Sequence, residues 1–253
     1  MKTFISTGFP FTIGDVDLLT VTTTDALTLG ADPVWMRSFL HPEEQAIFAG
    51  LEQEKRRFDW LAGRLAGKHL VCHTLRRLMG QEIAPATFAL LSAGQVPRLE
   101  HLPEKAAQVL ASRHLSLSHT DGRAVAGMAP FPVGVDMEKR RPILKEAVGR
   151  AFSVREQAMV APEDLIALWT AKEAVMKVLG SGLGTIDPLQ LEIEDFCLHD
   201  SFFIRCAETV SSEGGPRFDG RSKGCPRFHC LTLRDHDYVM TIARRDPGSG
   251  FVK

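Results

Sequence analysis

Apolar residues recur at helical spacing in two stretches of the chain. In the first stretch they are Leu61, Leu65, Val71, Leu75 and Leu78. This spacing predicts a helix over Phe58–Met79, and Gly80 is a suitable residue to end it. A similar pattern predicts a second helix over Leu165–Leu179, which Gly180 would end.

Alternation of apolar and polar residues indicates strands. His114–Ala129 and His229–Ala243 each alternate on both sides of a polar turn that contains aspartate, so we expect two β-hairpins. Thr20–Leu29 and Val133–Glu138 are the expected opening strands of two halves. Helices combined with antiparallel strands are typical of an α+β fold.

The same order of patterns occurs twice along the chain. Glu-Gln-Ala stands at 44–46 and again at 156–158, and each is followed by a tryptophan, Trp60 or Trp169, that opens a helical run. A hairpin follows in both cases, and the offsets between matching residues are all about 110 residues. We therefore predict two pseudo-symmetric α/β halves, with chance similarity between amphipathic helices as the alternative. The predicted halves are residues 1–130 and 131–253.

Composition narrows the class of protein. The chain has 253 residues, of which 44% are hydrophobic and 24% charged, as in an ordinary globular protein. Its formal net charge is −1, so it lacks the overall positive field typical of nucleic-acid-binding proteins. The five cysteines include no CxxC pair, no apolar run reaches the roughly 18 residues of a membrane span, and the N-terminus does not resemble a signal peptide. We expect a cytoplasmic protein with reduced thiols that binds neither nucleic acid nor membrane.

Two carboxylates stand close together in the predicted strand Val133–Glu138. Asp136 and Glu138 are two residues apart, so both side chains point to the same face of the strand. A divalent cation such as Mg²⁺ would offset their repulsion, whereas the alternative is a solvated edge strand. Three cations at 139–141 follow directly, and phosphate recognition would account for both signs of charge.

The second predicted helix carries a further acidic and a further basic residue. Trp169, Glu173 and Lys177 are spaced four apart and therefore share one face. Glu173 is a candidate third carboxylate, and Lys177 a candidate phosphate ligand. The alternative is an ordinary Glu–Lys surface pair, although a tryptophan one turn earlier favours burial of this face.

The N-terminal half offers polar residues of its own. Ser118 and His119 end an alternating strand, where His119 would donate to a phosphate, or where the pair would cap a turn. Arg57, Arg64 and Lys68 share one face of the first predicted helix. Together they would bind a nucleotide phosphate, and the alternative is a solvated helix face.

These residues resemble a known family. The run from Val133 to Glu138, followed by Trp169-x-x-Lys172-Glu173-Ala174-x-x-Lys177, is similar to the two-part signature of the 4′-phosphopantetheinyl transferases. The intervening Phe152-Ser153-x-x-Glu156 fits the same pattern. The length and the doubled architecture resemble the surfactin-synthetase type, and this resemblance implies a monomer.

The resemblance implies a role for each matching residue of the C-terminal half. Asp136, Glu138 and Glu173 correspond to ligands of Mg²⁺. Glu173 also corresponds to the residue proposed as the base, although a water molecule is an open alternative. Lys177 corresponds to the lysine that contacts the phosphates of coenzyme A.

The resemblance also assigns contacts of coenzyme A to the N-terminal half. The matching phosphate ligands are Ser118, His119, Arg57 and Lys68, with Arg56 as an alternative to Arg57. Near the adenine the family often has Gly-Lys-Pro or Gly-Arg-Pro. Here Gly94 and Pro97 are the expected contacts, but the segment Gly94-Gln95-Val96-Pro97 lacks the cation and has one more residue, so Arg98 is the candidate replacement.

The activity implied is transfer of phosphopantetheine from coenzyme A to a serine of an apo acyl or peptidyl carrier protein, with release of 3′,5′-ADP. Glu173, Lys177 and His119 would be its catalytic groups, and the ligand would lie between the halves.

The carrier proteins modified by this family present an acidic helix, which a basic surface would complement. Candidate residues for this surface are Arg140, Arg141, Lys145 and Arg150.

Two other functions are alternatives to the transferase. They are a magnesium-dependent hydrolase of a nucleotide or of coenzyme A, and a catalytically silent coenzyme A-binding protein. Which carrier is served, in fatty-acid, polyketide or nonribosomal peptide synthesis, stays open.

Overall fold

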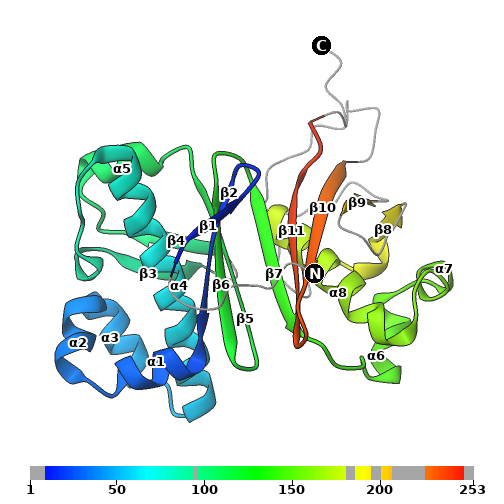
Figure 1. Ribbon diagram of the computed structural model, residues 1–253, viewed down its shortest axis with the longest axis horizontal. Helices are drawn as coiled ribbons and strands as arrows, with labels where there is room; N and C mark the ends of the chain where they lie inside the picture. The colour runs from blue at the N-terminus through cyan, green and yellow to red at the C-terminus, as the bar shows by residue number, and fades with distance from the viewer. Residues whose placement is uncertain (1–8, 94–95, 181–185, 195–200, 207–225, 248–253) are drawn as a thin grey trace. The chain divides into compact units, whose positions relative to one another are not determined.

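The computed structural model describes residues 9–93, 96–180, 186–194, 201–206 and 226–247. The chain divides into two compact units, an N-terminal unit of residues 5–133 and a C-terminal unit of residues 134–253 together with 1–4 (Figure 1). Within the described residues, no helix is both long enough and apolar enough to cross a bilayer.

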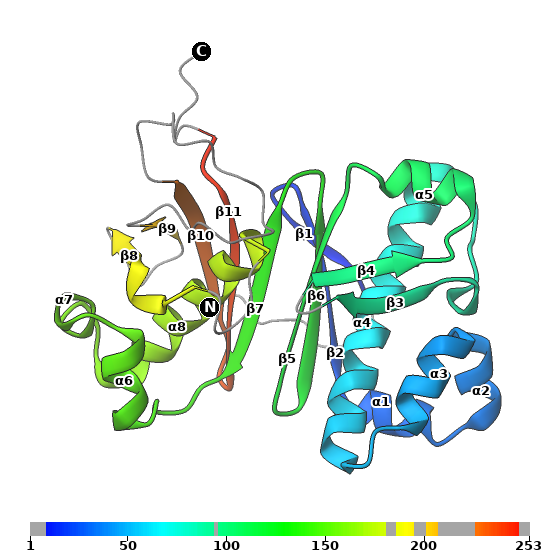
Figure 2. The same cartoon turned by 180° about the vertical axis from the view of Figure 1, so that it is seen from behind.

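The N-terminal unit packs one long helix on a four-stranded antiparallel sheet. The strands, in spatial order, are β1 (Phe11–Ile13), β2 (Val16–Thr22), β6 (Arg123–Ala129) and β5 (His114–Thr120). Helix α4 (Glu54–Met79) packs on β2, β5 and β6, as Figure 2 shows. Leu61, Leu65 and Val71 of the predicted apolar stripe are buried here and belong to the core.

Shorter elements complete this unit, and most of them contact α4. They are α1 (Thr23–Gly30), α2 (Pro33–Phe39), α3 (Pro42–Ala49), the 3₁₀ turn η1 (Pro85–Thr87), the hairpin of β3 (Ala89–Ala93) and β4 (Val96–Glu100), and α5 (Glu104–Leu110).

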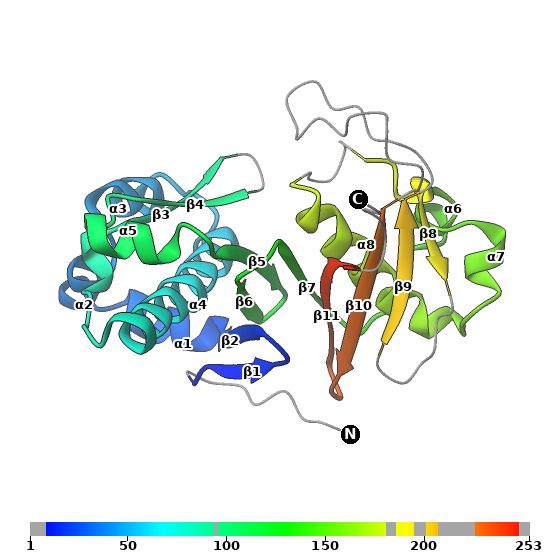
Figure 3. The same ribbon diagram turned by 90° about the horizontal axis from the view of Figure 1, so that it is seen from above.

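The C-terminal unit is built on a five-stranded sheet (Figure 3). Its strands, in spatial order, are β7 (Val133–Lys139), β11 (Tyr238–Arg245), β10 (Arg227–Arg234), β9 (Ser201–Cys206) and β8 (Leu191–Glu194). Helix α8 (Leu165–Val178) packs on β10 and β11. The other helical elements are α6 (Lys145–Ala151), α7 (Val154–Gln157), η2 (Pro162–Asp164) and η3 (Pro188–Gln190).

The α+β fold and the elements expected around the candidate site are confirmed. Both predicted helices form, and the glycines that follow them, Gly80 and Gly180, have φ angles of 67° and 69° that suit a helix end. Strand β5 pairs with β6 and β10 with β11, as the two hairpins required. The predicted strand Val133–Glu138 is β7.

The predicted strand Thr20–Leu29 is wrong over most of its length. Strand β2 ends at Thr22, and α1 begins at Thr23. Thr22 and Asp25 form a capping box, in which the Asp25 backbone N–H donates to the Thr22 hydroxyl at 3.1 Å. This reciprocal cap starts a helix at Thr23, whereas the alternation of threonine and apolar residues had indicated a continuing strand.

Candidate functional site

Strand β7 lies directly against helix α8. Gly134 allows this approach, because a Cβ atom at that position would lie 1.9 Å from the carbonyl oxygen of Ala174. The Lys177 ammonium of α8 donates to Asp136 Oδ1 at 2.8 Å and to the Val135 carbonyl oxygen at 3.0 Å. The two segments that the sequence singled out therefore meet in the C-terminal unit.

At this contact, the charges of Asp136 and Glu138 in β7 affect the carboxyl group of Glu173 in α8. Asp136 and Glu173 are buried, with 4% and 9% of their surface exposed. Burial, followed by the negative charge of Asp136, raises the pKa of Glu173 to about 7. Lys177 opposes this shift and Glu138 adds to it. The structure thus brings Glu173 into electrostatic contact with both acidic residues of β7.

The donor set of this cluster fits a hard divalent cation. Asp136, Glu138 and Glu173 offer only oxygen atoms, which are the ligands that Mg²⁺ prefers. A cation would also offset the repulsion among three carboxylates in a partly dry environment. Lys177 contributes one positive charge, which leaves the cluster with net negative charge when all three acids are ionised.

Lys172, the residue before Glu173, forms a buried ion pair that the sequence analysis did not identify. Its ammonium donates to Glu156 Oε2 and to the carbonyl oxygens of Ala151 and Pro188, each at 2.9 Å. These bonds join α8 to α6, α7 and η3, so they fix the rotation of the helix that carries Glu173. The available signal was a lysine between apolar residues of the first three turns of the helix, at Ala171 and Ala174.

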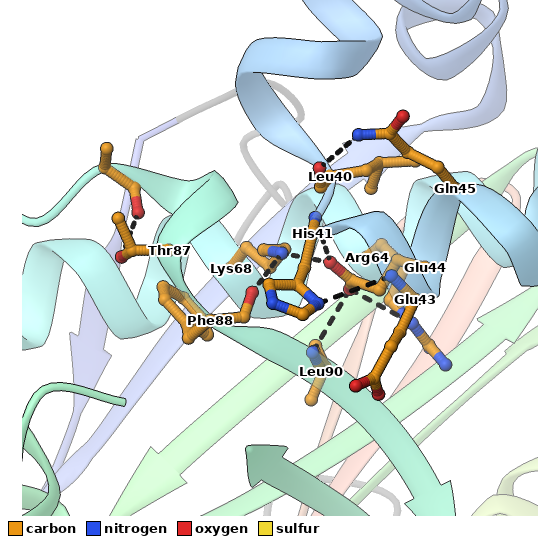
Figure 4. Close-up of polar contacts among 11 residues, drawn as sticks. Leu40, His41, Glu43, Glu44, Gln45, Arg64, Lys68, Thr87, Phe88 and Leu90 are labelled. Atoms are coloured by element: carbon orange, nitrogen blue, oxygen red, sulfur yellow. Dashed lines mark hydrogen bonds and ion pairs between the residues drawn. The ribbon is translucent and has the colours of Figure 1, made fainter. Parts of the chain in front are cut away.

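In the N-terminal unit, the geometry contradicts the prediction for Lys68. Its side chain is fully buried, and its ammonium donates to Glu44 and, at 2.7 Å, to the Phe88 carbonyl oxygen (Figure 4). The pKa of Lys68 is lowered, because the effect of desolvation exceeds the opposing effect of the hydrogen bond to Glu44. The ammonium therefore stabilises the core and does not face a ligand.

Arg64 and Arg57, the two cations predicted to share a face with Lys68, also do not form an open basic face with it. Arg64 is 6% exposed, and its guanidinium lies over the Trp60 ring at 4.5 Å. The guanidinium of Arg57 lies over the Phe48 ring at 4.6 Å. Arg57 is only half-buried, so it stays a candidate ligand, whereas Arg64 belongs to the interior.

The remaining predicted contacts lie in the same unit. Ser118 is buried and His119 exposed near the end of β5, where they pair in register with Val125 and Ala124 of β6. Pro97 lies in β4 opposite Ser92. The prediction for Gly94 lies outside the described residues.

Glu44 and Glu156 occupy the same place in two similar clusters. Each is the N3 residue of a capping box, and the N-cap residue of the box is His41, just before α3, or Ser153, just before α7. Each accepts a backbone N–H from a later strand and an N–H from a buried lysine. The strand residues are Leu90 and Ile193, at 3.2 and 3.3 Å, and the lysines are Lys68 and Lys172.

The two clusters support the predicted relation between the halves, which stays a prediction. They do not support matching the two tryptophans. Trp60 lies eight residues before Lys68, whereas Trp169 lies three residues before Lys172. Alignment on the buried lysines therefore places the tryptophans at different positions of their helices.

Comparison with known proteins identifies the region that holds the carboxylates. Residues 132–243, which include β7 and α8, match the family model described as the 4′-phosphopantetheinyl transferase superfamily. This part of the chain is therefore similar to that superfamily. The match covers all three candidate metal ligands of the transferase signature, and also Lys172 and Lys177.

Two curated transferases are similar to a larger part of the chain. The 4′-phosphopantetheinyl transferase Sfp of Bacillus subtilis (strain 168) is 31% identical over 156 residues, which are 58% of this chain and 62% of the relative. A 4′-phosphopantetheinyl transferase of Bacillus subtilis is 25% identical over 168 residues, or 60% of this chain and 71% of the relative. The chain thus spans about three fifths of the length of the first of these relatives.

Proposed function

We propose that this protein transfers the 4′-phosphopantetheine arm of coenzyme A to a serine of an apo carrier protein, in a reaction that requires Mg²⁺. The observation that carries the proposal is the contact of β7 with α8, where Asp136, Glu173 and Lys177 meet inside the region that matches the transferase superfamily. The names of the two curated relatives support the same activity. We also propose, on the resemblance and on cysteine usage, that the protein acts as a cytoplasmic monomer.

In the proposed reaction, the serine Oγ attacks the β-phosphorus of coenzyme A. The bond from this phosphorus to the bridging oxygen breaks, and 3′,5′-ADP leaves with that oxygen. Phosphoryl transfer of this kind depends mainly on positioning and on neutralisation of charge. Asp136, Glu138 and Glu173 would hold Mg²⁺, which supplies positive charge to the pyrophosphate when bound.

Two side chains of α8 have further proposed roles. The Lys177 ammonium would turn from Asp136 to a phosphate oxygen and take up part of its charge. Glu173 would accept the proton of the serine hydroxyl, because burial makes its carboxylate more basic than an exposed one. His119, Ser118 and Arg57 stay proposed contacts of the coenzyme A phosphates, and Lys68 does not.

A cavity beside the carboxylates is the proposed docking place for the carrier. Its volume is about 770 Å³, and Glu138 lies in its wall together with Ile143, Leu144 and Trp169. Arg141 and Arg150 also line it. The charged residues of the wall are two arginines and two glutamates, Glu138 and Glu146. A helix with apolar and acidic residues would therefore fit with its acidic side on Arg141 and Arg150.

We expect Arg150→Glu to raise the KM for an acidic carrier protein several-fold and to leave the KM for coenzyme A unchanged. The substitution places a negative charge where the carrier would present its own, and like charges repel. Steady-state kinetics with each substrate varied in turn measures both constants. The matched control is Arg155→Glu, an exposed residue of α7 outside the cavity lining. Equal effects of the two substitutions would remove Arg150 from the docking surface.

The experiment that tests the function is intact-protein mass spectrometry of an apo carrier incubated with this protein, coenzyme A and Mg²⁺. A gain of one phosphopantetheine that EDTA abolishes is the expected result. Breakdown of coenzyme A in the absence of any carrier would favour the hydrolase. Binding of coenzyme A without modification of several acyl and peptidyl carriers would favour the silent binding protein.

A further inference from the structure

Three side chains with metal-binding atoms meet in the N-terminal unit, apart from the carboxylate cluster. His41 caps α3, Glu43 lies in its first turn, and His101 follows β4. Their candidate ligand atoms all lie within 4.8 Å of one another. The His101 ring nitrogen Nε2 lies 2.8 Å from Glu43 Oε1. Residues about 60 positions apart in the sequence thus converge on one small region.

The backbone holds this arrangement from two directions. His101 has a φ of 62°, in the left-handed region that few residues other than glycine, asparagine, aspartate and histidine adopt. This turn sets the His101 ring on the His41 ring, with centroids 4.6 Å apart and planes within 11° of parallel. On the other side, His41 is the N-cap residue of α3. Its Nδ1 accepts the Glu43 backbone N–H in a long hydrogen bond, with 3.4 Å between the two nitrogen atoms.

All three side chains are accessible to a solvent ion. The side chains of His101 and Glu43 are 49% and 48% exposed, and His41 is half-buried. Near-parallel rings do not aim both lone pairs at one point, so a shared ion requires a rotation about χ2. The exposure of His101 leaves room for this rotation, and the long bond to His41 Nδ1 is weak enough to be given up.

The chemistry of these donors differs from that of the carboxylate cluster. Two imidazoles and one carboxylate are typical ligands of Zn²⁺ and similar divalent transition-metal ions, whereas Mg²⁺ prefers oxygen alone. Three protein ligands leave a fourth position for water. The positive end of the α3 dipole disfavours a cation at this place, and the negative charge of the Glu43 carboxylate offsets that effect.

We infer that His41, Glu43 and His101 form a second metal site, one that binds Zn²⁺ or a similar divalent transition-metal ion. The ion joins the start of α3 to the end of β4. His41 and Glu43 belong to the same helix start as Glu44, whose carboxylate accepts the His41 backbone N–H at 3.0 Å and binds the buried Lys68 (Figure 4). An ion at this site therefore stabilises the edge of the polar cluster in the N-terminal unit.

The test is a titration of the full chain with Co²⁺ and with Zn²⁺ in an excess of Mg²⁺, followed by visible absorption and by calorimetry. The variants are His101→Asn, which keeps a residue that tolerates positive φ, and Glu43→Gln, which keeps the helix. The control is His236→Ala, a histidine that is 92% exposed in the C-terminal unit. Melting temperatures in EDTA check that each variant is folded.

We expect wild type and His236→Ala to bind one more equivalent of Co²⁺ than His101→Asn. Glu43→Gln should bind this equivalent at least about tenfold more weakly. Zn²⁺ should raise the melting temperature of wild type and of His236→Ala but not that of His101→Asn. If His101→Asn binds Co²⁺ with the stoichiometry and affinity of wild type, or if His236→Ala loses the same equivalent, the proposed site is wrong.

Discussion

Glu173→Gln should lower the rate of phosphopantetheine transfer by about 10²-fold or more and leave the protein folded. The carboxamide keeps the size of the side chain but removes its negative charge and its ability to accept a proton. The proposed reaction uses both properties, one to hold Mg²⁺ and the other to deprotonate the carrier serine. The rate is measured by mass spectrometry of the carrier at saturating coenzyme A and limiting Mg²⁺.

The matched control for this substitution is Glu163→Gln. Glu163 is exposed in η2 of the same unit, so the variant changes the net charge equally without touching the carboxylate cluster. It should transfer at the wild-type rate. Because burial already disfavours the charged form of Glu173, glutamine should not lower the melting temperature. Transfer by Glu173→Gln at the wild-type rate would overturn the proposed role of this residue.

The sequence predicted the parts of this site that depend on local periodicity. Alternation placed Asp136 and Glu138 on one face of β7, and helical spacing placed Glu173 and Lys177 on one face of α8. The contact between the two elements depends on Gly134, where any side chain would collide with the backbone of α8. Its presence in the motif was visible, but its packing role required the structure.

Burial of charged residues is the property that the sequence did not reveal. Lys68 occupies a helix face together with Arg57 and Arg64, and periodicity alone cannot distinguish a ligand-binding face from a core-facing one. The partner of Lys68, Glu44, is 24 residues away in another helix. Glu156, the partner of Lys172, is 16 residues away and also lies in another helix. Long-range pairing of this kind becomes visible only when the helices are packed.

Lys172→Met should lower the free energy of unfolding of the C-terminal unit by about 3–5 kcal/mol. The methionine fills a similar volume, so the expected loss comes from the groups that lose their partner rather than from a cavity. These are the Glu156 carboxylate, which becomes a buried unpaired charge, and the carbonyl oxygens of Ala151 and Pro188. Urea unfolding followed by Trp169 fluorescence measures the loss, in a Trp35→Phe/Trp60→Phe background where Trp169 is the one tryptophan left.

An exposed ion pair of the same unit provides the contrast. Arg205 pairs with Glu194 at 2.7 Å, but its side chain is 50% exposed, so Arg205→Gln should cost no more than about 1 kcal/mol. Adding Glu156→Gln to Lys172→Met removes the unpaired charge while keeping an acceptor for the cap of α7. The double variant should therefore be more stable than the sum of the two single effects predicts. A loss in Lys172→Met no larger than that in Arg205→Gln would show that the buried pair does not hold α8 in place.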